Sequence, residues 1–186
     1  MKTAYVFLAN GFEDVEAVTP VDYLRRAGVK VSVVSLEGSE VESSHNLTIR
    51  CDCTLDDVLN APLPDLVVLP GGMTGTKNLA ASEDLRKFIK KMMDERRFIG
   101  AICAAPAVVL GSWGLLDGRT WTGYPGVGST LTPRPGKERV VVDGHLVTSR
   151  AAGCAEEFSL VLIKLLCGPE SMRKVADAIL AREEEA

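Results

Sequence analysis

The chain has 186 residues, 46% of them hydrophobic, which is enough apolar sequence for the core of one domain. Its formal net charge is −4, and its lysines and arginines are scattered among acidic residues, so we expect no nucleic-acid partner. No stretch approaches the roughly 18 apolar residues that span a membrane, and the N-terminal apolar run is too short for a signal peptide, so we expect a cytoplasmic protein without membrane contact.

The first part of the sequence predicts a strand–helix–strand unit. Residues 4–9 form a continuous apolar run, typical of a strand that is buried on both faces. Helical spacing follows over residues 15–27, with Gly28 placed as a C-terminal cap, and residues 30–36 alternate like a second strand. Such a unit implies parallel strands joined by a right-handed crossover. The predicted apolar positions of the helix are Val15, Val18, Tyr23, Leu24 and Ala27.

The middle of the chain continues the alternation of strands and helices. Residues 37–64 are irregular, with a short hairpin predicted around residues 47–51 and a small helix near residues 55–59. A buried strand at residues 65–69 runs into Pro70-Gly71-Gly72, and Ser82 is suited to cap the following helix. The apolar stripe of that helix consists of Leu85, Phe88, Ile89, Met92 and Met93.

The last part begins with a strand at residues 98–102, followed directly by Cys103 and a helix over residues 104–113. The dipeptide Asp143-Gly144 predicts a hairpin between strands 139–142 and 146–149. Helices over residues 156–166 and 170–182 come next, the second amphipathic through Met172, Val175, Ala176, Ile179 and Leu180, and then an acidic tail at residues 183–186. This order predicts one α/β domain over residues 1–186: a doubly wound, mostly parallel sheet with helices on both faces and its site at the carboxyl ends of the strands.

The cysteines argue against disulfides and against a metal site. They are five in number, without the spacing of a disulfide framework, so we expect reduced thiols. Cys51 and Cys53 would share one face of a strand, but the chain has only two histidines and no second ligand pair near them. We therefore expect no metal.

Cys103 is the candidate nucleophile, because it lies at a strand-to-helix junction. The loops 11–16, 70–72 and 100–106 all leave carboxyl ends of predicted strands and can converge on one crevice. A sharp turn would push the sulfur of Cys103 outward, and the positive N-terminus of the next helix would favour its thiolate. Backbone N–H groups of Gly72 and Ala104 could hold an oxyanion. Position alone fits equally well a small buried hydrophobic residue.

Glu16 is the candidate partner of Cys103. It opens the first predicted helix in an otherwise apolar stretch. A carboxyl held partly out of water has a raised pKa, so it can stay protonated and donate a hydrogen bond to a thiolate. The alternative is an ordinary acidic residue stabilised by the helix dipole, a description that Glu13 and Asp14 fit better.

These motifs resemble those of the ThiJ/PfpI superfamily, in the branch that contains the Parkinsonism-associated deglycase and its closest bacterial relatives. The resemblance covers nearly the whole length and rests on four ordered segments: residues 11–16 with 19–22, residues 67–72, residues 101–106 and residues 146–150. It implies a flavodoxin-like three-layer sandwich. It also implies a homodimer formed through the first helix and its neighbours.

The same resemblance implies roles for individual residues. Cys103 takes the nucleophile position, and Glu16 that of the protonated carboxyl beside it. Gly72 and Ala104 take the oxyanion-hole positions. Arg139 and Glu157 match a pair that relatives join as a structural salt bridge under the site. Arg150 and Arg25 fall where relatives have an arginine near the site or the dimer contact.

Two departures from the family pattern affect the expected chemistry. Ala104 stands where protease-like relatives carry a histidine, and Tyr124 stands where the human-type proteins carry another. His145 follows a predicted turn and is interpreted as a solvated residue, whereas His45 lies where some relatives have an arginine near the site. Without an imidazole beside Cys103, a histidine-based protease or amidase mechanism is disfavoured. Tyr124, Arg150 and His45 are assigned to the periphery of the site.

Two functional hypotheses follow. The first is a cofactor-free, cysteine-dependent enzyme that acts on α-oxoaldehydes such as methylglyoxal, or on their early adducts with thiols and amines, and yields a 2-hydroxy acid. The second is an oxidation-sensing stress protein or chaperone in which Cys103 reacts with peroxide without significant turnover.

Overall fold

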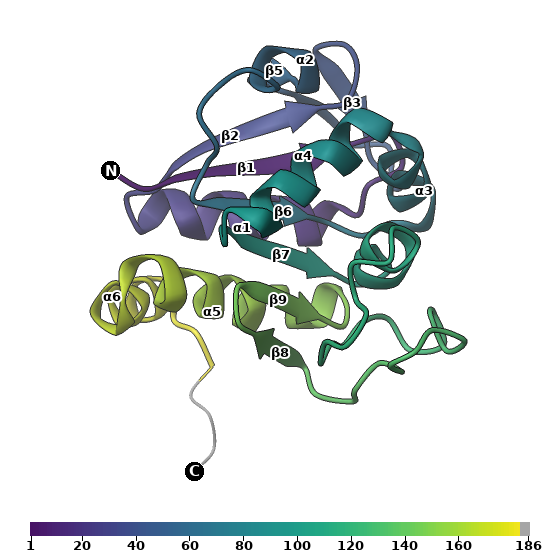
Figure 1. Ribbon diagram of the computed structural model, residues 1–186. Helices are drawn as coiled ribbons and strands as arrows, with labels where there is room; N and C mark the ends of the chain where they lie inside the picture. The colour runs from purple at the N-terminus through teal and green to yellow at the C-terminus, as the bar shows by residue number, and fades with distance from the viewer. Residues whose placement is uncertain (183–186) are drawn as a thin grey trace.

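The computed structural model describes residues 1–182, so the predicted acidic tail at residues 183–186 lies outside the described part. A seven-stranded sheet forms its middle layer, in the order β5-β2-β1-β6-β7-β9-β8 (Figure 1). Neighbouring strands are parallel except β8, which pairs antiparallel with β9. The strands are β1 (Thr3–Leu8), β2 (Lys30–Ser35), β5 (Cys53–Thr54), β6 (Leu66–Leu69), β7 (Phe98–Ile102), β8 (Val140–Asp143) and β9 (Leu146–Ser149). A separate hairpin joins β3 (Glu40–Glu42) to β4 (Thr48–Arg50).

Helices cover both faces of the sheet, which makes three layers. One face carries α1 (Asp14–Arg26), α5 (Ala155–Cys167) and α6 (Pro169–Ile179). The other carries α2 (Leu55–Val58), α3 (Met73–Ala81), α4 (Glu83–Asp94) and a π-helix at Pro106–Gly111. A short 3₁₀ turn, Ala152–Cys154, precedes α5.

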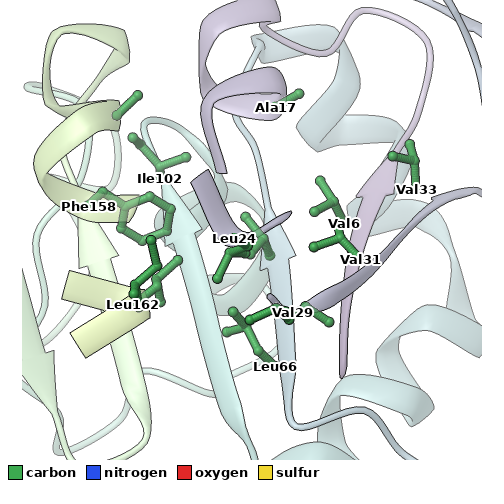
Figure 2. Close-up of a cluster of buried hydrophobic side chains, with 14 of the residues drawn as sticks. Val6, Ala17, Leu24, Val29, Val31, Val33, Leu66, Ile102, Phe158 and Leu162 are labelled. Atoms are coloured by element: carbon green, nitrogen blue, oxygen red, sulfur yellow. The ribbon is translucent and has the colours of Figure 1, made fainter. Parts of the chain in front are cut away.

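Side-chain alternation along the strands divides the core into two clusters. In β1, Val6 and Leu8 pack toward α1 and α5, while Phe7 packs toward α4. Figure 2 shows the first cluster, where Val6 lies with Leu24 of α1 and Phe158 of α5. Each large apolar side chain buried in this way contributes roughly 1.5–3 kcal/mol, and the central strands are buried on both faces, as their apolar runs predict.

The predicted fold class is confirmed. The predicted strands form close to their expected bounds: they are β1, β2, β6, β7, β8 and β9. A hairpin also forms before α2, from β3 and β4. Ser82 caps α4, because its hydroxyl accepts a hydrogen bond from the N–H of Leu85 at 3.2 Å. Among the helices of residues 1–182, none combines the length and the apolar character that crossing a membrane requires.

The buried face of α1 is predicted only in part. Leu24 is buried, and Tyr23 and Ala27 pack against the core as expected, but Val15 and Val18 are 47% and 44% exposed. Glu16 and Pro20 are buried in their place, so a carboxyl lies against the sheet where the pattern assumes an apolar residue. The burial of Glu16 is the first sign that this position has a chemical task.

The observed helices differ from the expected ones at three further points. Helix α3 was not predicted, because its sequence over residues 73–81 has little apolar periodicity. The helix after Cys103 is a π-helix that ends at Gly111 rather than at Trp113. Helix α6 ends at Ile179, and Leu180 adopts the left-handed conformation (φ 53°) with 90% of its surface exposed, so it is not part of the apolar stripe.

Candidate active site

The three predicted loops do converge, because β1, β6 and β7 are neighbours in the sheet and end at the same edge. The N–H of Glu13 donates to the carbonyl of Gly71 at 3.0 Å, which joins the first loop to the second. The N–H of Gly75 donates to Gly11 at 3.1 Å on the same side. These backbone bonds fix the start of α1 against the glycine loop.

Cys103 occupies a strained turn directly after β7. Its φ is 66°, in the left-handed region that side chains other than glycine rarely adopt. Two backbone hydrogen bonds hold it there: its N–H donates to Ser149 of β9 at 3.0 Å, and its carbonyl accepts from Tyr124 at 2.7 Å. The thiol is half-buried while Ala104 is buried, so the turn presents the sulfur at the surface of the crevice.

The sulfur of Cys103 lies among three polar groups. The carboxyl of Glu16 and the backbone N–H groups of Gly72 and Ala104 lie close enough to the sulfur to shift the pKa of Cys103. The approach is so close that a Cβ on Gly71 would lie 3.0 Å from the sulfur and collide with Glu16 Oε2. Gly72 itself has a φ of 88°, and any Cβ there would strike the carbonyl of Gly11.

Glu16 is buried, with only 1% of its surface exposed. Its Oε2 accepts a hydrogen bond from the N–H of Gly71 at 2.9 Å, and the N–H of Ala152 also lies against the carboxyl. Burial raises the pKa of Glu16 to about 7, with a further rise from the charge of Glu13, while the hydrogen bond with Cys103 and the two backbone N–H groups lower it. Glu13 has a different task, since its Oε2 caps α1 by accepting from the N–H of Glu16 at 2.8 Å.

The electrostatics of Cys103 depend on the protonation of Glu16. Burial and an ionised Glu16 together raise the pKa of Cys103 to about 12, although the N–H groups of Ala104 and Gly72 lower it. Burial and the neighbouring carboxylate thus oppose the thiolate that the positive N-terminus of the following helix is expected to favour. A protonated Glu16 replaces that repulsion by a hydrogen bond to sulfur, so the state of Cys103 is set by where one proton resides.

The peripheral residues lie at different distances from this chemistry. Tyr124 contacts Cys103 through its backbone N–H, while its side chain is 48% exposed. Arg150 Nη1 donates to the carbonyl of Lys137 at 3.2 Å. Arg25 lies in the last turn of α1, where it donates to the carbonyl of Val31 at 3.2 Å, far along the helix from Glu16.

The two histidines take separate positions, and neither supports a Cys–His pair. His145 follows the β8–β9 turn, whereas Cys103 bonds the far end of β9. His45 Nδ1 lies 2.6 Å from Asp14 Oδ2, and this hydrogen bond raises the pKa of His45. A possible metal-binding group is formed by Glu13, Asp14 and His45, whose ligand atoms lie within 4.8 Å of one another. However, His45 is hydrogen-bonded to Asp14, and Glu13 accepts the N–H of Glu16 that it caps.

The predicted salt bridge between Arg139 and Glu157 is present. Arg139 also contacts the turn next to the site. Arg139 Nε donates to Glu157 Oε2 at 2.7 Å, and its Nη2 donates to the carbonyl of Gly153 at 2.6 Å. It thereby holds the turn that carries Ala152 against Glu16. Sequence reasoning missed Ala152 and Ser149 because they act through backbone atoms, which leave no side-chain pattern.

Comparison with known proteins gives a consistent result. A sequence model of the DJ-1/PfpI family matches residues 2–165. Protein DJ-1 homolog A of Arabidopsis thaliana is 39% identical over 185 residues, which cover 97% of this chain and 47% of that protein, so the chain spans about half the length of this relative. A protein of Pyrococcus horikoshii named a deglycase is 33% identical over 162 residues, covering 85% of this chain and 95% of its own. The structure described as oxidized Toxoplasma gondii DJ-1 superposes with a TM-score of 0.94 at 34% identity, covering 98% of this chain and 100% of that one.

Proposed function

The chain belongs to the DJ-1/PfpI family, and from this membership and the surroundings of Cys103 we propose that it is a cysteine-dependent enzyme that needs no cofactor. Its substrates are α-oxoaldehydes such as methylglyoxal, or their early adducts with thiols and amines. Its role is defence against carbonyl and oxidative stress. One relative of similar length is named a deglycase, which supports this substrate class.

The observation that carries the proposal is the set of groups around one sulfur. A nucleophile needs a partner that exchanges a proton and donors that stabilise the charge formed on the substrate oxygen. Glu16, with a pKa raised to about 7, is suited to give and take a proton near neutral pH. The N–H groups of Gly72 and Ala104 supply two donors beside Cys103.

The reaction begins when the thiolate of Cys103 attacks the aldehyde carbon and forms the C–S bond of a hemithioacetal. The N–H groups of Gly72 and Ala104 hydrogen-bond the new oxyanion. Glu16 removes the proton from that carbon and delivers it to the neighbouring carbonyl carbon through an enediol. The first carbon is thereby oxidised to a thioester and the second reduced to an alcohol. Water then cleaves the thioester, releasing the 2-hydroxy acid and the thiol, so methylglyoxal and water give lactate without an external oxidant.

Two substitutions test this proposal. Cys103→Ser and Glu16→Gln should each lower methylglyoxal consumption and lactate formation by at least a hundredfold, because each removes a group that takes part in a bond-forming step. Cys53→Ser, at another half-buried thiol, is the matched control and should keep full activity. Unchanged turnover in both site variants would exclude the enzyme.

Peroxide sensing by Cys103 is a second candidate function. The half-buried sulfur is reachable, and the donors that would hold an oxyanion can equally hydrogen-bond a sulfinate. A solved DJ-1 from Toxoplasma gondii is described as oxidized. Peptide mass spectrometry after mild peroxide should find Cys103 as the first cysteine to gain two oxygens. Earlier oxidation of Cys53 or Cys167 would remove the basis for this function.

We also propose that the chain forms a homodimer through α1. Val15 and Val18 leave an apolar strip exposed on this helix, and Leu47 of the neighbouring hairpin is 48% exposed. A cavity of about 170 Å³ lies between α1 and β4, with Val18 and Ile49 among its lining residues. Apolar surface gathered in this way is typical of a protein–protein interface.

A further inference from the structure

A small basic cavity lies at the edge of the sheet opposite to Cys103. It has a volume of about 200 Å³ and is bounded by the start of β7, the segment around Arg119 and the turn between β8 and β9. Each of these three segments contributes a basic or imidazole side chain: Arg96, Arg97, Arg119 and His145. No carboxylate is among its lining residues, although the chain as a whole carries a net charge of −4.

The arginines of this cavity keep most of their donors available. Within residues 1–182, the Arg96 side chain has no hydrogen-bond or ion-pair partner. Arg119 approaches Asp143 only to 3.8 Å, while Asp143 instead accepts a 2.6 Å bond from the N–H of Thr120. Arg97 Nη1 lies 3.3 Å from Asp65 Oδ1, which leaves the other N–H donors of its guanidinium group available.

The backbone brings these side chains together. Arg96 follows the end of α4 in the left-handed conformation, with φ 52°, and this turns the chain sharply into β7. Gly144, with nothing within 4 Å of a Cβ position, leaves the mouth of the cavity open at the hairpin turn. The ring of His145 is held beside Phe98, with 5.0 Å between ring centroids.

We propose that this cavity is a binding site for a phosphate group, free or carried by a phosphomonoester. Guanidinium groups recognise phosphate by paired hydrogen bonds from a planar fork, and three of them, two on one segment and one on another, match an anion of more than one charge. The site lies at the amino ends of β7 and β9, away from Cys103 at their carboxyl ends, so it is independent of the proposed carbonyl chemistry.

Isothermal titration of the full chain at low ionic strength tests the site, with inorganic phosphate and glycerol 3-phosphate as probes and acetate as the monoanionic comparison. We expect saturable 1:1 binding of at least one phosphate probe, and little binding of acetate. Arg96→Gln and Arg119→Gln should each weaken the affinity about tenfold or more, since each removes a charged donor pair. Arg86→Gln is the matched control, because Arg86 lies about 12 Å before the end of α4 at Asp94 and pairs with Glu83.

Several outcomes would overturn the site. They are no saturable binding at millimolar phosphate, acetate binding as tight as phosphate, or unchanged affinity in Arg96→Gln. If Arg96 served only to compensate the negative end of α4, its substitution would lower the melting temperature and leave phosphate affinity unchanged. Thermal unfolding of the same variants with and without phosphate separates the two cases, since a ligand that binds the folded chain raises the melting temperature by an amount that grows with the ratio of its concentration to Kd.

Discussion

Glu16 and Cys103 titrate as a pair, because each group alters the charge that the other can carry. Burial raises the pKa of Glu16 to about 7, and once Glu16 is ionised the pKa of Cys103 rises to about 12. Near neutral pH the carboxyl of Glu16 therefore loses its proton first, and the thiol of Cys103 keeps its own. A site of this kind keeps an acid and a nucleophile within one hydrogen bond.

The pH dependence of Cys103 alkylation should show this coupling directly. In the wild type we expect the alkylation rate to stay low through neutral pH and to rise only toward pH 12, because the ionised carboxyl of Glu16 and burial keep the thiol protonated. Glu16→Gln removes that charge, so the rise in the alkylation rate of Cys103 should move to lower pH. Peptide mass spectrometry after iodoacetamide treatment measures both profiles.

Cys53 is the internal control for that measurement, because its pKa is raised mainly by burial and it lies apart from Glu16. Its profile should be the same in both proteins. A wild-type Cys103 profile that superimposes on that of Glu16→Gln would contradict the coupling.

At the scale of elements, the glycine loop after β6 sets the spacing of the site. Gly71 lies between Glu16 and Cys103, and there is no room for a Cβ between them. Its N–H also donates to Glu16, so the loop both separates and orients the two groups. The loop is therefore as necessary to the proposed chemistry as the two side chains.

Gly71→Ala should abolish methylglyoxal turnover while the fold persists. The added methyl must displace either Glu16 or the sulfur of Cys103, and overpacking of this kind costs about 1–3 kcal/mol of stability. Gly153→Ala is the matched control, since it lies in the turn beside Ala152, where nothing is within 4 Å of a Cβ position. Steady-state kinetics and circular dichroism on both variants give the answer. Wild-type turnover in Gly71→Ala would contradict this role of the loop.

Which elements could be predicted from the sequence follows from how each is stabilised. The buried strands and α4 were predictable, because their apolar residues recur at a fixed period. The exposure of Val15 and Val18 and the burial of Glu16 were not, because a hydrophobic pattern excludes a carboxyl from the face against the sheet. Helix α3 and the π-helix depend on contacts with the rest of the fold rather than on their own periodicity.

At the scale of the whole molecule, the order of the strands brings the site together. Cys103 and Glu16 were predictable only through the family motifs that surround them, because position alone also fits a buried hydrophobic residue and an ordinary helix acid. Their partners Ser149 and Ala152 come from the other end of the sequence and act through backbone atoms. The parallel pairing of β7 with β9 places them there, and a single sequence does not reveal which strands become neighbours.

The proposed dimer follows from what the folded chain leaves exposed. α1 buries its carboxyl and presents valines to solvent, next to a cavity shared with β4. Glu13 and Asp14 precede these valines on the same segment, and Asp14 is bonded to His45 of the hairpin. A second chain packed on α1 would therefore cover the elements that position Glu16, so assembly and activity should be linked.

Val18→Asp should convert the dimer to a monomer, because it places a charge in the centre of an apolar contact, where desolvation without a partner costs several kcal/mol. Light scattering coupled to size exclusion measures the mass. Val142→Asp is the matched control: Val142 is 47% exposed on the edge strand β8, away from α1, and its substitution should leave the mass unchanged. If assembly supports the site, the monomer should also lose methylglyoxal turnover. A wild-type mass for Val18→Asp, or dissociation by Val142→Asp, would place the interface elsewhere.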